Sequence, residues 1–188
     1  MKKSLSELAA RITPEWTLFL DRDGVINRLL VNDYVKRPDA LEILPGVPET
    51  IARLNRLFKY IIVVTNQQGV GKGLMTAADL EEVHNHLRQQ VERAGGRLTA
   101  IYACTRRSDE PGNCRKPAPH LALRARRDYP DIDFSKSIMV GDQDTDIEFG
   151  ARLGMVTIWV SDRPGAFTGA HFPDYIIRAL RELDALSV

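Results

Sequence analysis

The sequence contains little cysteine and no long hydrophobic run. Two cysteines among 188 residues are too few for the disulfide framework of a small secreted domain. No stretch reaches the roughly 18 consecutive apolar residues that a membrane-spanning helix requires. The basic start at residues 1–5 is not followed by the apolar segment of a signal peptide. We therefore expect a cytoplasmic protein with no membrane partner.

An excess of charge of one sign is also missing. The chain has 26 Lys and Arg residues and 25 Asp and Glu residues, which gives a formal net charge of +1. Nucleic-acid-binding proteins generally present a strong excess of basic charge, so we expect no nucleic-acid partner. A chain of this length with 44% hydrophobic residues can bury a substantial core. We expect one domain over residues 1–188, with residues 1–16 as an N-terminal extension.

The sequence does contain short apolar runs that alternate with amphipathic segments. An apolar run bounded by polar residues or glycine is typical of a strand buried on both faces of a parallel sheet. Apolar residues spaced three and four positions apart indicate a helix. We expect strands at 17–21, 61–64, 98–104, 137–140 and 155–160, and helices at 47–58, 77–94, 116–128 and 147–153. This alternation indicates βαβ units, and hence an α/β fold with a parallel sheet.

Polar side chains follow several of the expected strands. The groups are Asp21 and Asp23 after the first strand, Thr65 and Asn66 after the second, Asp142 after the fourth, and Lys116 at the start of the helix between the third and fourth. Taken alone, the two aspartates fit a strand end followed by an Asp-Gly turn. However, the carboxyl ends of parallel strands face one edge of the sheet, where ligands bind in α/β folds. We therefore expect these groups to converge on one site.

Such a set of groups suits phosphoryl transfer through a carboxylate. Mg²⁺ favours oxygen ligands and usually binds through one or two carboxylates plus a substrate phosphate. Thr65 and Asn66 can hold phosphate oxygens, and Lys116 can offset the negative charge of the transferring group. Because hydrolysis of phosphate monoesters can require accelerations of up to ~10²¹, we expect a metal ion and preorganised donors to act together.

Four short motifs of the sequence resemble those of the haloacid dehalogenase (HAD) superfamily, and they occur in the same order along residues 19–162. They are Asp21-Arg22-Asp23-Gly24, Thr65-Asn66-Gln67, Lys116, and Gly141-Asp142-x-x-x-Asp146. The resemblance implies a Rossmann-like three-layer sandwich around a mainly parallel sheet of at least five strands. The insertions between the motifs are too short for a large cap domain, so we expect none.

The same resemblance implies a catalytic role for four residues. Asp21 would be the nucleophile that forms an aspartyl-phosphate. Asp23 would protonate the leaving alcohol and then activate the water that hydrolyses the intermediate. Thr65 would bind phosphoryl oxygens, and Lys116 would hold both the nucleophile and the phosphate.

The resemblance also implies a magnesium site. Mg²⁺ would be bound by Asp21, by the backbone carbonyl of Asp23 and by Asp142. Asp146 would support the site by hydrogen bonds without touching the metal. Gln143 stands where related sequences often carry Lys or Arg, which removes one positive charge near the phosphate and leaves the exact substrate open.

Within the superfamily, the sequence resembles small phosphatases that lack a large cap. These are the D-glycero-D-manno-heptose 1,7-bisphosphate phosphatases and the histidinol-phosphatases, and the shared runs are L-D-R-D-G, T-N-Q-x-G and C-R-K-P. In that group Arg115 would contact the substrate beside Lys116. The run Gly69–Gly73 is not a nucleotide-binding P-loop, because Gly73 follows Lys72 where that motif requires Ser or Thr.

Those relatives usually carry a zinc loop, from which this sequence departs. Cys104 and Cys114 stand at two of the matching ends, but Arg106 and Gly112 replace a histidine and a cysteine. Structural zinc requires four ligands, so we expect no structural Zn²⁺. Arg106 and Arg107 are candidates for binding a second substrate phosphate. His84 and His86 lie off the apolar stripe of their helix, and we expect them to be solvated.

The leading hypothesis is a Mg²⁺-dependent phosphatase acting on a small phosphorylated metabolite, first of all a heptose bisphosphate, with release of phosphate from the anomeric position. Histidinol phosphate is the second substrate candidate. A nucleic-acid 3′-phosphatase is a further alternative, as is a non-catalytic binding protein on the same fold. The presence of every side chain that the chemistry requires favours an enzyme.

Overall fold

The computed structural model describes residues 4–163 and 167–187 and is organised around a six-stranded sheet. The strand order is β3-β2-β1-β4-β5-β6, and each neighbouring pair is parallel. The strands are β1 (Thr17–Leu20), β2 (Tyr60–Asn66), β3 (Ala100–Cys104), β4 (Ser137–Gly141), β5 (Val156–Val160) and β6 (Tyr175–Ile177). β2 and then β3 lie on the outer side of β1, and β5 and then β6 lie on the outer side of β4. The strand order therefore reverses between β1 and β4, and a crevice forms at such a point.

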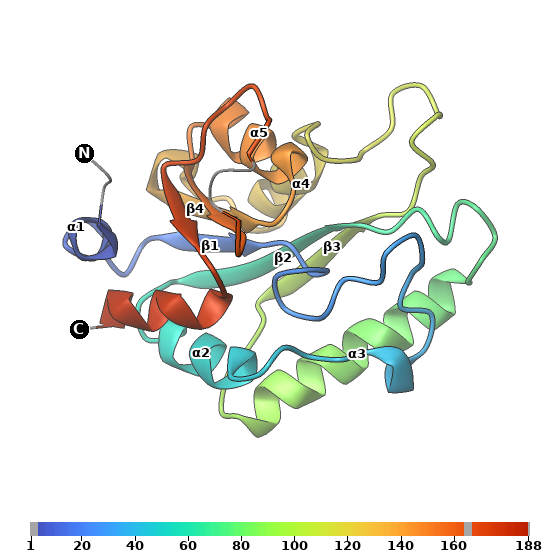
Figure 1. Cartoon of the computed structure of the whole chain (residues 1–188), viewed down its shortest axis with the longest axis horizontal. Coiled ribbons are helices and arrows are strands. Elements are labelled where there is room, and N and C mark those ends of the chain that lie inside the picture. The colour runs from blue at the N-terminus through green and yellow to red at the C-terminus, as the bar shows by residue number, and fades with distance from the viewer. Residues whose placement is uncertain (1–3, 164–166, 188) are drawn as a thin grey trace.

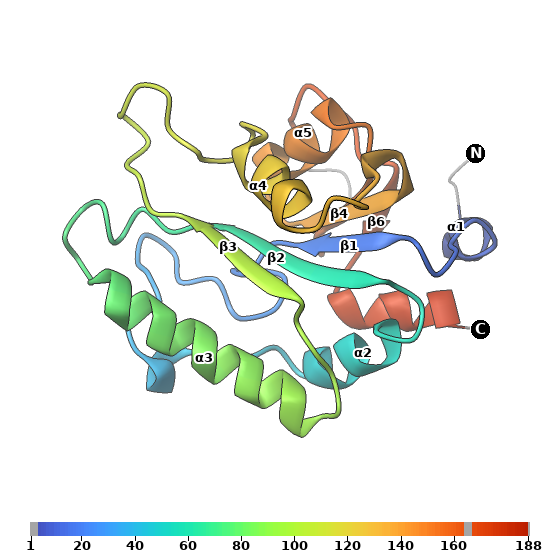
Figure 2. The ribbon, with the colours of Figure 1, turned by 180° about the vertical axis from the view of Figure 1, so that it is seen from behind.

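Helices cover both faces of the sheet, as Figures 1 and 2 show from opposite sides. One face carries α2 (Val47–Leu54), α3 (Ala77–Arg93) and the 3₁₀ helix η3 (Leu180–Ser187), and the other carries α4 (His120–Asp128) and α5 (Asp144–Arg152). Two short 3₁₀ helices, η1 (Pro38–Ala40) and η2 (Phe134–Lys136), lie in connections. The expected α/β three-layer sandwich is confirmed.

The central strands supply side chains to both layers of core. Leu18 and Leu20 of β1 belong to the cluster under α2 and α3, whereas Phe19 between them belongs to the cluster under α4 and α5. Ile138 and Met139 of β4 divide in the same way. Successive side chains of a strand point to opposite faces. Burial on both faces therefore requires the unbroken apolar runs seen in the sequence.

Two helix boundaries differ from the expectation by four residues. The helix expected from Lys116 begins at His120, with Pro119 at its N-cap. Proline cannot donate a backbone hydrogen bond and disfavours a helical residue before it, so Pro117 and Pro119 delay the helix. The helix expected to reach residue 58 ends at Leu54.

The N-terminal extension contains the short helix α1 (Leu5–Ala9). Ser4 and Glu7 form a capping box at its start, which satisfies backbone donors at the helix end. Leu8 is fully buried in the core cluster that also contains Leu183. In the described part of the chain, no helix combines the length and the apolar character needed to cross a membrane.

Candidate active site

A cleft of about 340 Å³ lies at the carboxyl ends of the central strands. Its walls come from the segments that follow β1, β2 and β4 and from the turn before α4. The expected site residues that line it are Asp21, Asp23, Thr65, Asn66, Arg115, Lys116, Asp142 and Asp146. All the site residues predicted from the sequence thus lie around a single cleft.

The Lys116 ammonium group lies at the centre of the site. Its Nζ is 2.7 Å from Oδ1 of Asp21 and 2.7 Å from Oδ1 of Asp146, and it donates a hydrogen bond of 2.7 Å to the Val64 carbonyl. Burial alone would lower the pKa of Lys116, but the charges of Asp146 and Asp21 outweigh it and raise the pKa. The lysine is therefore a fixed cation beside the proposed nucleophile.

Asn66 holds the backbone around this lysine. The Asn66 amide donates to the Lys116 carbonyl at 3.3 Å, and its Oδ1 accepts from the Lys116 backbone N–H at 3.0 Å. The reciprocal pair joins the end of β2 to the turn before α4. Asn66 also lines the cleft. It therefore positions the Lys116 backbone and also lies where the sequence analysis expects it to contact the substrate.

Three carboxylates gather opposite a single lysine. One carboxylate oxygen from each of Asp21, Asp142 and Asp146 lies within 4.8 Å of the other two. Burial raises the pKa of Asp21 to about 8, with repulsion from the neighbouring aspartates adding to the rise and Lys116 opposing it. Burial and the Asp146 charge raise the pKa of Asp142 to about 6. The cluster therefore favours protonation unless a further cation is present.

The donor set fits a divalent cation that prefers oxygen. Asp142 Oδ1 is buried and has no hydrogen-bond partner in the described structure, while its Oδ2 accepts from Gln143 Nε2 at 2.9 Å. The backbone carbonyl of Asp142 accepts from Trp159 Nε1 at 2.9 Å, which fixes the segment after β4. An unpartnered buried carboxylate oxygen beside a second carboxylate is what a hard cation such as Mg²⁺ would satisfy.

Two glycines allow the carboxylates to come together. Gly24 has φ +84°, and a Cβ there would lie 2.2 Å from Oδ2 of Asp142. A Cβ on Gly141 would lie 2.1 Å from the Cβ of Asp146. Both distances are far below van der Waals contact, so only glycine permits this approach at either position.

The Asp23 carboxylate is held apart from this cluster by its own donors. It accepts from Arg22 Nη2 at 3.0 Å, from Asn27 Nδ2 at 2.9 Å and from Gln67 Nε2 at 2.6 Å. Burial raises the pKa of Asp23, but the Arg22 charge and these hydrogen bonds more than offset it and hold the pKa below its usual value. Gln67 Nε2 also donates to Thr65 Oγ1 at 2.9 Å. This link connects the proposed acid to a proposed phosphate ligand.

Sequence reasoning did not identify Arg22, Asn27 and Gln67 as part of the site. Arg22 is fully buried, which is unusual for an arginine, and it lies directly between two aspartates in the sequence. Gln67 belongs to the Thr-Asn-Gln motif and could have been noticed there. Asn27 carries no comparable signal.

His84 contradicts the expectation that it is solvated. The residue is 3% exposed, and its Nε2 has no hydrogen-bond partner in the described structure. Burial, together with the nearby Arg22 charge, lowers the pKa of His84 to about 3. The side chain is therefore a neutral part of the interior. His86 is half-buried and lies 3.3 Å from Gln90 Nε2.

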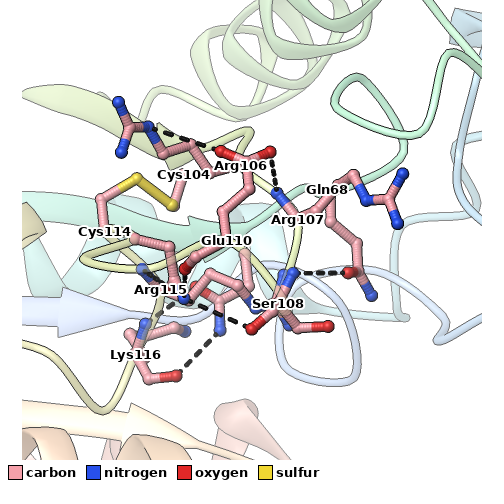
Figure 3. The surroundings of a disulfide bond; sticks show 11 residues. Gln68, Cys104, Arg106, Arg107, Ser108, Glu110, Cys114, Arg115 and Lys116 are labelled. Carbon is pink, nitrogen blue, oxygen red and sulfur yellow. Dashed lines mark hydrogen bonds and ion pairs between the residues drawn. A yellow bond between two sulfur atoms is a disulfide. The ribbon is translucent and has the colours of Figure 1, made fainter.

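Cys104 and Cys114 form a disulfide bond, which the sequence analysis did not predict. Figure 3 shows it at the base of the loop that runs from the end of β3 to Arg115 and Lys116. Both sulfur atoms are thus engaged with each other. Acidic, histidine or cysteine side chains that could together hold a metal ion are found, among the described residues, in the aspartate cluster.

Comparison with known proteins agrees with this geometry. The HAD-hydrolase-like family model matches residues 113–183. The D-glycero-alpha-D-manno-heptose-1,7-bisphosphate 7-phosphatase of Mycobacterium bovis is 44% identical over 146 residues, covering 78% of this chain and 77% of that protein. The D-glycero-beta-D-manno-heptose-1,7-bisphosphate 7-phosphatase of Bordetella bronchiseptica is 35% identical over 73% of this chain and 75% of its own length.

Solved structures give the same result. The D,D-heptose 1,7-bisphosphate phosphatase of B. bronchiseptica, complexed with magnesium and phosphate, aligns with a TM-score of 0.78 at 29% identity, covering 90% of this chain and 96% of that one. The chain belongs to the HAD-like hydrolase family. It is a phosphatase of that family, so the predicted enzyme class is confirmed.

Proposed function

We propose that the chain is a Mg²⁺-dependent phosphatase that hydrolyses D-glycero-D-manno-heptose 1,7-bisphosphate. The observation that carries the proposal is the buried Asp21–Lys116–Asp146 cluster with Asp142 beside it. The 44% identity over 146 residues to a heptose bisphosphate phosphatase supports it. A small phosphorylated sugar as partner and a cytoplasmic location, both expected from the sequence, are part of this proposal.

The relatives' names bear on which phosphate is released. Both relatives compared by sequence above are named 7-phosphatases, which differs from the expectation of release at the anomeric position. We therefore propose hydrolysis at carbon 7. The relative with the alpha name is more similar to this chain than the one with the beta name, at 44% against 35% identity, which supports the alpha anomer as the preferred substrate.

In the proposed reaction Asp21 attacks the phosphorus atom and forms an aspartyl-phosphate, while the bond to the sugar oxygen breaks. Asp23 protonates that oxygen. The approaching phosphate dianion raises the pKa of Asp23 and so favours the protonated form that a general acid needs. Asp23 then takes a proton from water, which attacks the phosphoaspartate and releases inorganic phosphate. Thr65 orients phosphoryl oxygens, and Asn66 maintains the position of Lys116.

Asp21, Asp142 and the backbone carbonyl of Asp23 would hold the Mg²⁺, with Asp146 supporting Lys116. When bound, the ion supplies positive charge that offsets the carboxylates and the phosphate. Lys116 stabilises the Asp21 carboxylate through its ion pair and disfavours its protonation. Arg115, whose Nη1 is buried without a partner, is available to the substrate.

A comparison of substrates tests the proposal. The purified protein is assayed for phosphate release with Mg²⁺ on both anomers of the heptose bisphosphate and on histidinol phosphate. We expect the highest kcat/KM on the alpha bisphosphate. A higher kcat/KM on histidinol phosphate would contradict the proposed substrate, and no release from any phosphomonoester would favour the non-catalytic alternative.

A further inference from the structure

The Cys104–Cys114 disulfide joins the end of β3 to the segment that enters the cleft. Cys104 is the last residue of β3 and is fully buried, and its carbonyl accepts from the Gln67 backbone N–H at 2.7 Å. Arg115 and Lys116, which line the cleft, follow Cys114 directly. The bond therefore fixes the far end of a loop to the sheet, as Figure 3 shows.

The first half of this loop is also held by hydrogen bonds to the segment after β2. The Gly71 backbone N–H donates to the Thr105 carbonyl at 3.0 Å. The Ser108 backbone N–H donates to Gln68 Oε1 at 3.2 Å. These contacts use backbone and amide groups, so a change in the sulfur atoms leaves their donors and acceptors intact.

The second half of the loop, residues 109–114, makes its polar contacts close by. In the described part of the chain, its hydrogen bonds and ion pairs end on residues 106–115. Arg106 and Arg107, the candidates for a second substrate phosphate, are engaged in these ion pairs. Cys114 packs against the core cluster under α4 and α5. The disulfide is therefore the covalent link that holds this half of the loop against the core.

Arg115 depends on this loop more than Lys116 does. Lys116 is held from outside the loop by Asn66 and by two aspartates. The Arg115 backbone N–H instead donates to Oδ1 of Asn113, a residue of the loop, at 3.0 Å. Its side-chain Nη1 is buried without a hydrogen-bond partner in the described structure. Release of Cys114 would therefore affect the position of Arg115 first.

We propose that the Cys104–Cys114 disulfide is a redox switch that controls the position of Arg115 and, through it, the affinity for substrate. This inference rests on the proposed function, which places Arg115 at the substrate in a cytoplasmic enzyme. Disulfides of cytoplasmic proteins are usually transient and either catalytic or redox-sensing. The disulfide form holds Arg115 at the cleft, whereas in the dithiol form substrate binding must order its side chain again.

The switch is reduced by thiol–disulfide exchange with a dithiol. A thiolate of the dithiol attacks the sulfur of Cys114, which is partly exposed, whereas Cys104 is buried. The disulfide bond breaks, and Cys104 leaves as a thiolate and takes up a proton. The second thiolate of the dithiol then attacks the mixed disulfide, and Cys114 leaves and is protonated. Two electrons and two protons pass to the protein, and the reductant becomes a disulfide.

The two redox forms of the wild type can be compared directly, because the chain contains two cysteines and both are in this bond. Dithiothreitol prepares the dithiol form, and titration of free thiols confirms each state. Kinetics are measured with Mg²⁺ on heptose 1,7-bisphosphate at a temperature where both forms are folded. We expect the KM to be about two- to tenfold higher in the dithiol form, the cost of ordering one side chain. The kcat should stay within about twofold, because Lys116 keeps its contacts outside the loop.

Three variants separate control through Arg115 from general loosening. Arg115→Ala should raise the KM of the disulfide form, and reduction should then change the KM by less than about twofold. Cys104→Ser/Cys114→Ser should show the KM of the dithiol form with or without dithiothreitol. Asp109→Asn is the matched control, because it removes an exposed ion pair of the same loop. It should keep the wild-type KM and its response to reduction.

Hydrogen–deuterium exchange tests the switch without relying on activity. We expect faster exchange at residues 109–115 in the dithiol form and unchanged exchange in β2. The switch would be overturned by equal exchange or equal KM in the two forms, by an unchanged response to reduction in Arg115→Ala, or by failure of dithiothreitol to reduce the folded protein. Absence of phosphate release in both forms would instead contradict the proposed function, while exchange would still show whether reduction frees the loop.

Discussion

Gln67 Nε2 lies 2.6 Å from Oδ2 of Asp23, and the same nitrogen donates to Thr65 at 2.9 Å. One buried amide thus orients both the proposed acid and a phosphate ligand. Gln67→Ala removes a hydrogen bond to a charged group, which contributes about 1.5–3 kcal/mol. We expect kcat to fall about ten- to a hundredfold with a smaller change in KM.

The pH profile separates this role from simple loss of structure. A hydrogen bond to a carboxylate stabilises its charged form, so removing Gln67 should raise the pKa of Asp23. The limb of the kcat profile that depends on Asp23 should therefore move to higher pH. Gln89→Ala, at an exposed position of α3, should leave kcat and its pH profile unchanged. A fall in kcat without movement of either limb would contradict the orienting role.

Asp21→Asn tests the nucleophile. The amide keeps the shape of the carboxylate but cannot form an aspartyl-phosphate, so we expect kcat to fall by at least about 10⁴-fold. The circular dichroism spectrum should match that of the wild type. Asp144→Asn is the control, because Asp144 lines the same cleft but lies outside the carboxylate cluster. Retention of more than about one per cent of wild-type activity by Asp21→Asn would rule out the covalent mechanism.

The aspartate cluster should make both activity and stability depend on Mg²⁺. We expect EDTA to abolish phosphate release and added Mg²⁺ to restore it. Asp142→Asn should raise the Mg²⁺ concentration for half-maximal activity by at least about tenfold. Ligand binding to the folded state raises Tm, so Mg²⁺ should raise the Tm of the wild type and have much less effect on the variant. Full activity after exhaustive chelation would exclude the metal site.

The Mg²⁺ effect should also depend on pH. Metal ligands must be deprotonated, and burial and the Asp146 charge raise the pKa of Asp142 to about 6, while burial raises that of Asp21 to about 8. Protons therefore compete with the ion as the pH falls from 8 toward 5. We expect the Mg²⁺-induced rise in Tm to be large at pH 8 and small at pH 5, as measured by differential scanning fluorimetry. An equal rise at both values would contradict these shifts.

The arrangement of the site could be predicted from the sequence because it follows from the sheet. A strand buried on both faces requires a continuous apolar run, as in Leu18–Leu20, and the polar residue after such a run must lie at the carboxyl end. Asp21 and Asp142 follow neighbouring strands, β1 and β4. The convergence could therefore be predicted from the strand positions and their parallel direction alone, whereas the order of the strands in the sheet could not.

Two features were not predicted, for different reasons. His84 lies on the buried stripe of α3, four residues after Leu80 and three before Leu87, and its ring is buried near the charge of Arg22. The expectation that it is solvated was therefore wrong, because the helical spacing places this histidine on the apolar face. The pairing of Cys104 with Cys114, by contrast, depends on the path of the loop between them, which no local pattern encodes.

The disulfide should stabilise the fold by restricting the unfolded chain. Its cysteines are 10 positions apart, and closing a loop of that size contributes about 2.5–3 kcal/mol in the chain-entropy description. We expect the double variant Cys104→Ser/Cys114→Ser to lose about that much free energy of unfolding in urea. Dithiothreitol should lower the Tm of the wild type but not that of the double variant.

Gly24→Ala tests the close approach of the loop after β1 to Asp142. Alanine at φ +84° costs about 1–2 kcal/mol of stability, and its Cβ would also collide with Asp142 Oδ2, 2.2 Å away. Gly154→Ala shares the strained backbone, with φ +75°, but its Cβ would meet nothing within 4 Å. Gly24→Ala should therefore lose more stability in urea than Gly154→Ala, which isolates the cost of the strained backbone.

Only Gly24→Ala should also lose activity, because it displaces a proposed metal ligand. We expect its half-maximal Mg²⁺ concentration to rise by at least about tenfold, while Gly154→Ala keeps the wild-type value. Steady-state assays across a Mg²⁺ titration, made at a temperature where both variants are folded, provide this comparison. Equal Mg²⁺ dependence in the two variants would show that the distance between Gly24 and Asp142 does not control the metal site.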